Sequence, residues 1–502
     1  MAIEIRETEW KYEAPPGATL PDFTDLPQVA AQTAPEKQTL RAVYHDTEDL
    51  RLIRAGITLR RRTGGQDAGW HLKLPDSSGS RLEIQLPARR DLPAELSDLV
   101  RVWTRGLPLK PVARITTIRR RQLLRDEAGT TLAEVVVDDV TAESLGETTT
   151  KYRWDEVEVE LAEGDLRLLK AADKRLRSNG MLRAAHTAKL ERALADRLAV
   201  RTEGPRYGCT SELTSKSSAA DVVLAYVRSQ VDAIVAYDPK VRRAEPDAVH
   251  QMRVATRRLR STLRTFGEIF PDDGIRWLAE ELKWLSEILG QARDEEVVRD
   301  HLLANLAGLP AQLVVGPVGE RIAGHFIPRQ AAAHISVVAE LDGDRYLALL
   351  SGLDLLLDSP ALTRAAGRKA TVELPGMMTR ALRRVDRRMT GAYQTARGPE
   401  RDLALHESRK AAKRARYAAE TVRPVLGQQA RRSAKAMKAL QTTLGEHQDC
   451  VLAGQTAFEL GMLAHTEGEN AFTYGVLHER DMVAAAAIQD QAERMWKQSR
   501  AK

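Results

Sequence analysis

The sequence predicts two domains of different fold class: an N-terminal antiparallel β-barrel or strongly curved sheet, and an all-helical, internally duplicated C-terminal domain. Short alternating strand patterns between Gly, Pro or Asp breaks run to about residue 200, and helical spacing dominates from about residue 218. The chain of 502 residues is also too long for one ordinary core. We therefore expect domains at 1–200 and 218–502, joined by a polar linker at 201–217 that is rich in Gly, Ser and Thr.

The composition is that of a soluble globular protein, with 29% charged and 43% hydrophobic residues and a net charge of +6. The two cysteines, Cys209 and Cys450, lie far apart, so we expect no disulfide framework or zinc site and favour a reducing compartment. The N-terminal segment lacks the pattern of a signal peptide, and no apolar run approaches the roughly 18 residues of a membrane span. These features predict a cytoplasmic protein.

Two of the predicted strands carry acidic rows. Because side chains two apart share one face of a strand, the sequence groups Glu7 and Glu9 with Lys11, and Glu156 with Glu158 and Glu160. In the second strand Val157, Val159 and Leu161 occupy the opposite face. A solvated sheet surface is the alternative interpretation, but an unbroken acidic row opposite an apolar row favours a nearby cation, since like charges repel.

Basic residues follow the same alternation on other predicted strands. They are Arg60 with Arg62, Lys73, Arg81, and Arg119 with Arg121, the last pair competing with Arg120 because the strand register is open. Inside a closed barrel these residues would surround a carboxylate-lined region. Such a lumen suits a triphosphate, whose oxygens Arg and Lys bind while Glu holds a bridging Mg²⁺.

The helical half contains a duplicated motif. VHQMRVATRRLRSTLRTF begins at Val249 and LHESRKAAKRARYAAETV at Leu405, and a second pair, LKWLSEILGQARD and MKALQTTLGEHQD, follows at nearly the same offset. On an α-helix the spacing i, i+3, i+7, i+10 forms one face, and it is occupied by His250, Arg253, Arg257 and Arg260 in the first copy and by His406, Arg409, Lys413 and Arg416 in the second. Two similar helical bundles are therefore expected.

A cationic row of this kind needs an anion, because like charges along one face destabilise a helix. A linear phosphate polymer would bridge it through charge-assisted contacts. Nucleic acid is the less favoured alternative, since only Phe266 and Tyr417 in the two basic segments could stack on bases. Backbone-only binding to duplex DNA stays open.

The N-terminal half, about residues 3–195, resembles the CYTH superfamily of triphosphate tunnel metalloenzymes. Glu7-Thr-Glu-Trp-Lys11 matches its ExExK signature, and YHDTEDLRLIRAGITLRRR is similar to a later family stretch. The resemblance implies an eight-stranded antiparallel tunnel that hydrolyses or rearranges triphosphates with Mg²⁺ or Mn²⁺. It implies metal ligation by Glu7, Glu9, Glu158 and Glu160, support of the metal or the attacking water by Asp138, and phosphate binding by Lys11, Arg60, Arg62, Lys73, Arg119 and Arg121, with Arg114 and Lys189 as weaker candidates.

The helical half, about residues 218–495, resembles the CHAD domain, a conserved-histidine α-helical domain. The paired H-x-x-R-x-x-x-[RK]-R-x-R helices and the LGQARD and LGEHQD segments carry the resemblance. It implies binding of inorganic polyphosphate in a basic channel between two bundles by the eight residues of the duplicated helix face, together with Lys283 and Lys438. The copies differ at Arg293 and Gln448, so the two halves need not contribute equally.

The leading hypothesis is thus a metal-dependent tripolyphosphate or polyphosphate hydrolase whose helical domain captures the polymer. The principal alternative is a non-catalytic polyphosphate binder, for instance a granule-associated protein. Adenylyl cyclase or thiamine triphosphatase activity ranks lower, because no residue pattern indicates a base-recognition pocket.

Overall fold

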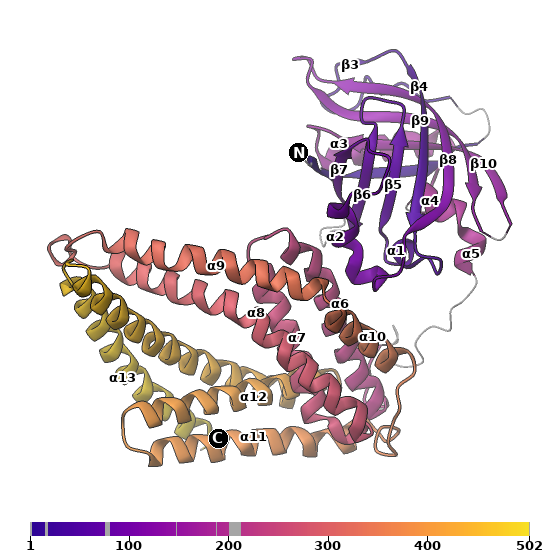
Figure 1. Cartoon of the computed structure of the whole chain (residues 1–502). Helices are drawn as coiled ribbons and strands as arrows, with labels where there is room; N and C mark the ends of the chain where they lie inside the picture. The colour runs from indigo at the N-terminus through magenta and orange to yellow at the C-terminus, as the bar shows by residue number, and fades with distance from the viewer. Residues whose placement is uncertain are drawn as a thin grey trace. The chain divides into compact units, whose positions relative to one another are not determined.

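The computed structural model describes residues 3–15, 19–75, 81–146, 148–186, 188–199 and 212–500. The chain divides into two compact units, Met1–Thr202 and Glu203–Lys502 (Figure 1). Much of the expected linker, 201–211 with Cys209, lies outside the described residues, and the first long helix of the second unit begins at Ala219. Among the described helices none is long and apolar enough to cross a membrane.

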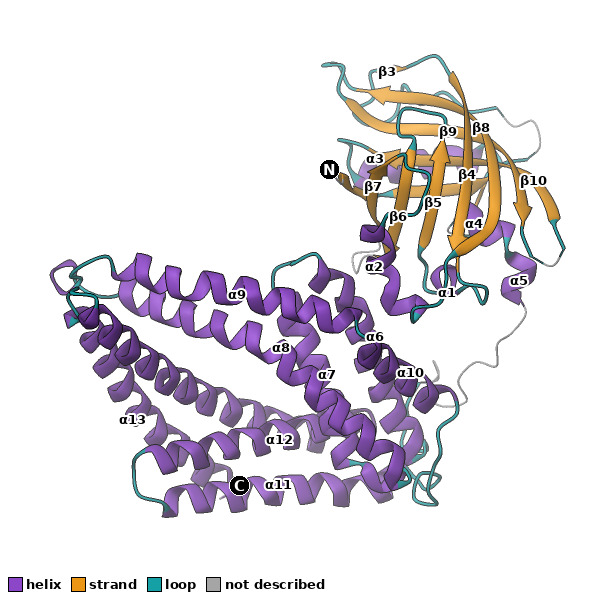
Figure 2. Cartoon of the chain, viewed as in Figure 1, coloured by secondary structure: helices purple, strands orange, loops and turns teal. Residues whose placement is uncertain are grey.

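The first unit is built around one antiparallel sheet that curves strongly (Figure 2). Its described strands are β1 (Ile3–Glu7), β2 (Glu9–Glu13), β3 (Ala31–Gln32), β4 (Glu36–Asp46), β5 (Thr58–Thr63), β6 (Gly69–Pro75), β7 (Arg81–Pro87), β8 (Lys110–Arg125), β9 (Thr131–Ser144), β10 (Thr150–Leu161) and β11 (Leu182–Arg183). They pair in the order β1-β7-β6-β5-β4-β8-β9-β10-β2-β11, with β3 beside β8.

The described residues thus form eleven strands, whereas the family resemblance implies eight. The difference has two local causes. The N-terminal strand is interrupted at Thr8, so its halves count separately: β1 pairs with β7 and β2 pairs with β10. The two-residue pairings of β3 and β11 provide the other additional strands.

Helices cover the outer face of the sheet. The outward residues of β2, β9 and β10 pack against α3 (Leu166–Ser178) in one apolar core, where Val157 and Val159 are fully buried. This confirms the predicted apolar face opposite Glu156, Glu158 and Glu160. Residues of β5, β6 and β7 pack against α2 (Ala94–Thr104) in a second core.

A third apolar cluster lies inside the curve of the sheet, at one end. Here α4 (Lys189–Ala193) places Leu190 and Ala193 against inward residues of β8, β9 and β10, among them Val140 and Trp154. The short helices α1 (Arg51–Arg54) and α5 (Ala195–Ala199) complete this unit. The remaining inward-facing residues are mostly polar, so the rest of the interior of the curved sheet is charged.

The second unit is all helical. Its described elements are α6 (Ala219–Arg242), α7 (Ala248–Thr265), η1 (Gly267–Ile269), α8 (Asp272–Ala307), η2 (Ala311–Leu313), α9 (Val318–Asp342), α10 (Asp344–Asp358), α11 (Ala370–Gln394), α12 (Pro399–Thr466) and α13 (Phe472–Arg500). In α12 the backbone leaves the helical region at Gly427, with φ 53° and ψ −122°, so this element is two helices joined at a kink.

The duplicated motifs occupy corresponding places in the helix order. His250 lies on α7 and Gly290 on the following α8, while His406 and Gly445 lie on the two sides of the kink in α12. In the first copy α7 packs against α6 and α8, and in the second α12 packs against α11 and α13 (Figure 1). The duplication of sequence is therefore a duplication of helix order.

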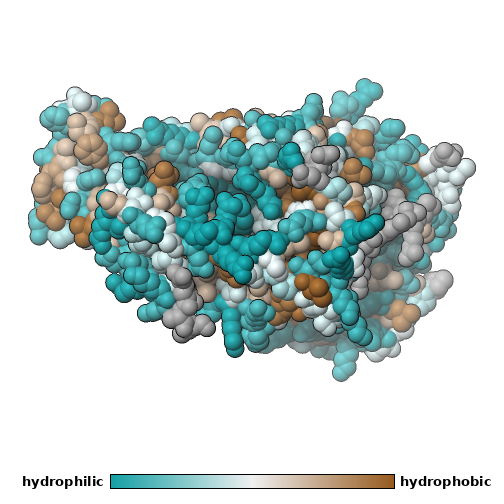
Figure 3. All heavy atoms as spheres, turned by 90° about the horizontal axis from the view of Figure 1, so that it is seen from below, coloured by the Kyte–Doolittle hydropathy of each residue, from teal (hydrophilic) through white to brown (hydrophobic). Residues whose placement is uncertain are grey.

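The surface is mainly hydrophilic, and hydrophobic atoms gather at one end of the face drawn in Figure 3. Large apolar side chains are exposed where α12 leads into α13, including Phe458, Met462 and Phe472. Single exposed apolar residues are ordinary for folded proteins.

Candidate functional site

A charged cavity of about 310 Å³ lies inside the sheet of the first unit. The described residues that line it include eight basic and six acidic side chains. Eleven of the residues singled out from the sequence are among them: Glu9, Lys11, Arg60, Arg62, Lys73, Arg81, Arg119, Arg121, Glu158, Glu160 and Lys189. Ten of the eleven lie on strands whose alternation was visible in the sequence, and the eleventh, Lys189 of α4, was a candidate from the family resemblance.

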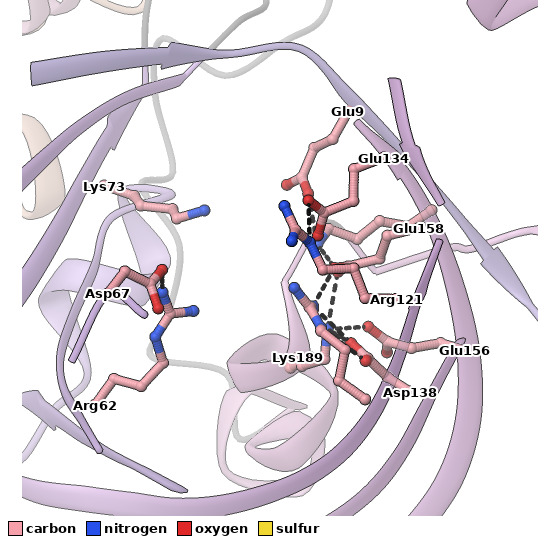
Figure 4. A network of polar contacts seen from close by, with 12 residues as sticks. Glu9, Arg62, Asp67, Lys73, Arg121, Glu134, Asp138, Glu156, Glu158 and Lys189 are labelled. Atoms are coloured by element: carbon pink, nitrogen blue, oxygen red, sulfur yellow. Dashed lines mark hydrogen bonds and ion pairs between the residues drawn. The ribbon is translucent and has the colours of Figure 1, made fainter. Parts of the chain in front are cut away.

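One wall of the cavity is centred on Glu158 of β10 (Figure 4). Its carboxylate forms ion pairs with Lys11 of β2, with the Nη2 atom of Arg119 of β8 at 2.8 Å, and with the Nζ atom of Lys189 at 2.8 Å. Burial raises the pKa of the Glu158 carboxyl, but these three cations outweigh burial and hold its pKa well below the ordinary range. Glu158 is therefore a buried, ionised carboxylate.

Lys189 lies among three carboxylates. Its Nζ atom is 2.9 Å from Asp138 Oδ2, 2.6 Å from Glu156 Oε1 and 2.8 Å from Glu158 Oε1. Arg119 donates two further hydrogen bonds to Asp138, at 2.9 and 2.7 Å. The oxygens of the three carboxylates lie within 4.8 Å of one another, close enough to hold a metal ion, but the lysine ammonium stands among them.

Glu160 has less cationic compensation than Glu158 or Glu9, the latter of which pairs with Lys11 at 3.1 Å. Glu9 and Glu160 lie directly opposite each other on β2 and β10, and both line the cavity. Burial, and then the charge of Glu9, raise the pKa of the Glu160 carboxyl to about 7. Oxygen donors crowded in this way match the preference of Mg²⁺ and Mn²⁺, and a cation would relieve their repulsion. Glu9 and Glu160 therefore add two carboxylates to the wall of the cavity that carries Glu158.

The opposite wall is cationic. Figure 4 shows Lys73 and Arg62 across the cavity from the carboxylates. Arg60 donates to the Tyr44 hydroxyl at 3.2 Å, and Arg62 forms an ion pair with Asp67. Burial and the neighbouring Arg60 lower the pKa of the Arg62 guanidinium to about 9, which shows that this wall favours additional negative charge.

Glu83 of β7 organises the cationic wall. Its carboxylate lies 3.8 Å from Arg60 and 3.6 Å from Lys73, and it is 2.6 Å from Nδ1 of His71. Burial lowers the pKa of His71 to about 4, so the imidazole is neutral at physiological pH. Glu83 of β7 thus positions the cationic groups of Arg60 and Lys73 in this wall.

The remaining predicted residues of this unit fall into separate places. Asp138 is fully buried behind the lining, where it contacts Arg119 and Lys189. Arg114 is exposed and lies 3.9 Å from Glu143, outside the cavity. Arg120 is exposed as well, which settles the strand register in favour of Arg119 and Arg121. Glu7 lies on β1 opposite Arg81, and its side chain lies outside the described residues.

The cavity also contains residues that were not selected as site residues. They are Tyr44, Asp67, Glu83 and Glu134, with Glu156 and His71 directly behind them. Glu134 pairs with Arg121 at 2.7 Å, and it is four residues before Asp138 on one face of β9. That same-face spacing was the available signal for Glu134, as the spacing from Arg81 was for Glu83.

In the helical unit four cations from the two motif copies lie close together: Arg253 and Arg257 of α7 with Arg409 and Lys413 of α12. Burial, and then Arg409 and Arg257, lower the pKa of the Lys413 ammonium to about 6. Arg253 forms an ion pair with Asp294 at 2.8 Å. Within the described part of the chain, no acceptor faces the buried Nε atoms of Arg257 and Arg409. This cluster therefore carries more positive charge than its surroundings balance.

The paired glycines explain part of the duplicated sequence. A Cβ atom at Gly290 would lie 3.0 Å from Arg253 Nη2, and one at Gly445 would lie 3.1 Å from Arg409 Nη2. Each glycine therefore leaves room for the guanidinium of its own motif copy. This reason could not be read from the sequence, where only the matching positions were visible.

The other predicted residues of this unit are more dispersed. Arg416 is bound to Glu420 at 2.7 Å and to Gln441 at 3.0 Å, and Lys283 and Lys438 are exposed. Burial, and then the charge of Arg264, lower the pKa values of Arg260 and Arg414. These three arginines extend the cationic surface along α7. Burial lowers the pKa of both motif histidines, His250 and His406.

Comparison with known proteins agrees with this architecture. The CYTH domain model matches residues 6–194, and the CHAD domain model matches residues 225–457. The uncharacterised protein Rv2226 of Mycobacterium tuberculosis (strain H37Rv) is 37% identical over 508 residues, covering 97% of this chain and 95% of that protein. The chain belongs to the CYTH–CHAD proteins.

Solved structures similar to each domain cover parts of the chain. For the CHAD domain they include PptA from Streptomyces chartreusis (22% identity, 56% of this chain, 100% of that chain, TM-score 0.47). The CHAD domain from the plant Ricinus communis is similar at 25% identity (58% of this chain, 96% of that chain, TM-score 0.46). For the CYTH domain they include the PH1819 protein from Pyrococcus horikoshii OT3 (18% identity, 38% of this chain, 99% of that chain, TM-score 0.24).

The raised pKa of Glu160 predicts a pH-dependent stability of the CYTH domain. The folded protein retains a proton on Glu160 between the ordinary pKa of 4.5 and about 7, so stability falls as pH rises through this window. In EDTA, Glu160→Gln should raise the melting temperature at pH 8, by about 2–4 °C per kcal/mol, and should change little at pH 5. Thermal melts of wild type, of this variant and of the exposed control Glu163→Gln test this, and a pH-independent difference would contradict it.

The glycine contacts predict unequal effects of two helix substitutions in the CHAD domain. Gly391→Ala on α11 enters open space and should stabilise by about 1 kcal/mol through helix propensity. Gly445→Ala should stabilise less, because its Cβ must displace the Arg409 guanidinium. Denaturant unfolding of both variants measures the difference; equal gains would show that the Arg409 contact carries no constraint.

Proposed function

We propose that this protein is a divalent-metal-dependent hydrolase of inorganic tripolyphosphate or polyphosphate, whose CHAD domain binds the polymer. The observation that carries the proposal is the division of the CYTH cavity into a carboxylate wall and a facing cationic wall. A triphosphate with its metal needs both, because the metal requires oxygen donors and the phosphate oxygens require Arg and Lys.

The proposal includes a closed tunnel of eight strands. When β1 and β2 are counted as one strand bent at Thr8, and the two-residue β3 and β11 are set aside, the described sheet has eight strands. Its outermost members, β1 and β2, are then the same strand, so the pairing returns on itself. A closed interior would exclude bulk water and strengthen each electrostatic contact with the substrate.

In the proposed complex each wall has a distinct role. Arg60, Arg62 and Lys73 bind phosphate oxygens, and Glu9, Glu158 and Glu160 hold the metal, which when bound neutralises charge on the phosphates and polarises the bond to be broken. Asp138 and Glu83 position cations rather than substrate. Phosphoryl transfer asks mainly for this positioning and charge stabilisation.

An inorganic substrate is favoured over a nucleotide by the character of the lining. Tyr44 is the one aromatic ring among the described residues that line the cavity, and its hydroxyl accepts a hydrogen bond from Arg60. A nucleobase usually requires stacking or hydrogen-bonding partners beyond the phosphate site. Fourteen of the 21 described residues that line the cavity are charged, which suits phosphate groups better than a base.

For the CHAD domain we infer two pseudo-symmetric bundles that bind polyphosphate with the clustered cations Arg253, Arg257, Arg409 and Lys413. The support is that burial, followed by the neighbouring cations, lowers the pKa of Lys413 to about 6, and that buried Arg Nε atoms face no acceptor among the described residues. A polyanion would supply the missing charge and acceptors. Lys283 and Lys438, being exposed, would contribute at the periphery.

A non-catalytic polyphosphate binder, for instance one associated with granules, is the second candidate. The position of Lys189 among Asp138, Glu156 and Glu158 favours it, since an ammonium occupies that carboxylate cluster. Tight binding of tripolyphosphate with no phosphate release would support this candidate over the hydrolase.

Loss of a metal ligand should abolish hydrolysis. Glu158→Gln is expected to lower phosphate release from tripolyphosphate by about 100-fold or more, because metal affinity and the pairing of Lys11 are lost together. A malachite-green assay with Mg²⁺ or Mn²⁺ measures it, with the exposed Glu163→Gln as control. Wild-type protein that releases no phosphate from any tested triphosphate or polyphosphate with either metal would refute the enzymatic proposal.

Loss of a clustered cation should weaken polymer binding without affecting the tunnel. Arg257→Gln should reduce polyphosphate affinity by about 10-fold, since a charge-assisted contact contributes about 1.5–3 kcal/mol. Calorimetric titration at several salt concentrations tests this, with the exposed Arg494→Gln of α13 as control. Stronger binding of DNA or RNA at equal phosphate concentration would point to a nucleic-acid ligand instead.

A further inference from the structure

The CHAD domain contains a second group of side chains, distinct from the clustered cations, whose residue types can ligate a metal. It joins His301 of α8, Cys450 of α12 and Asp481 of α13. One potential ligand atom from each residue lies within 4.8 Å of the others. Cys450 and Asp481 are buried, at 6% and 1% exposed, whereas the His301 side chain is 25% exposed, so the cluster is reached from the surface on the side of His301.

Hydrogen bonds within the cluster reach only one of the two Asp481 carboxylate oxygens. Its Oδ1 atom contacts His301 Nε2 at 2.7 Å and accepts a hydrogen bond from Asn305 Nδ2 at 2.8 Å. Its Oδ2 atom is buried and receives no hydrogen bond from the described residues. An uncompensated carboxylate oxygen is costly in a protein interior, so packing between α8 and α13 does not by itself explain this arrangement.

We propose that His301, Cys450 and Asp481 form a binding site for a zinc-type divalent transition metal. One thiolate, one imidazole and one carboxylate are a donor set that Zn²⁺ and Co²⁺ accept and that Mg²⁺ does not prefer. Three protein ligands leave the fourth tetrahedral position to water. The cation would compensate Asp481 Oδ2, which nothing else described does.

Binding displaces two protons. Burial raises the pKa of the Cys450 thiol to about 11, so the apo site holds a neutral thiol. His301 Nε2 donates to Asp481 Oδ1, and this hydrogen bond raises the pKa of the imidazole. The metal would replace the thiol proton and the Nε2 proton, which both leave to solvent, and His301 would ligate through Nε2 while keeping its proton on Nδ1. Because the three ligands come from α8, α12 and α13, the metal would cross-link helices of both motif copies.

Cobalt substitution tests the site directly. Titration of the full chain with Co²⁺ should give one equivalent with a thiolate-to-cobalt charge-transfer band, and added Zn²⁺ should displace it. The band reports the thiolate ligand and is not produced by metal bound to the carboxylates of the CYTH cavity. Cys450→Ser should remove the band, whereas the matched control Cys209→Ser, at the other cysteine of the chain, should retain it.

A second variant keeps the test independent of the cysteine. His301→Asn should weaken Co²⁺ affinity by about 10–100-fold while circular dichroism shows unchanged helix content. Wild-type protein without a thiolate band, or a band that persists in Cys450→Ser, overturns the proposal. A band lost equally in Cys209→Ser also overturns it, because the metal would then lie elsewhere.

Discussion

Burial of charge inside a sheet is the constraint on which the CYTH domain depends. A buried carboxylate is stable only when cations and hydrogen-bond donors compensate its lost hydration. Glu158 meets this requirement with cations from three different elements: Lys11 of β2, Arg119 of β8 and Lys189 of α4. Strand pairing, the position of α4 and the polarity of the cavity are therefore coupled. Removing one partner leaves an uncompensated charge on another element.

In the CHAD domain the same constraint applies to buried cations rather than to buried carboxylates. Its cations converge with fewer carboxylates than cations, and burial, followed by the charges of Arg409 and Arg257, lowers the pKa of the Lys413 ammonium. A polyanion that balances this charge would therefore stabilise the fold of the CHAD domain when it binds. The two domains differ in that the CYTH domain balances most of its buried charge internally, whereas the clustered cations of the CHAD domain are balanced only in part by the described residues.

Local periodicity predicted much of this structure. Alternation in WDEVEVEL correctly separated Glu156, Glu158 and Glu160 from the buried Val157 and Val159, and helical spacing placed the basic rows on α7 and α12. Pairings between distant segments were not predictable in this way. The contact between Lys189 and Asp138, the support of Arg60 and Lys73 by Glu83, and the assembly of His301 with Cys450 arise from tertiary packing, which no spacing along the chain encodes. The interruption at Thr8 is likewise decided by which neighbours each half of the strand finds.

The pairing of β2 with β10, which lie far apart in the sequence, affects folding on the ribosome. Lys11 meets its partner Glu158 only after 147 further residues have been made, so β2 emerges long before β10 can pair with it. Pairing over such a separation is slow, and an unpaired strand edge invites association with other chains. The charged side chains that later face the cavity make such association unfavourable. The charged residues that line the cavity in the folded protein would thus also disfavour aggregation of the nascent chain before β10 is synthesised.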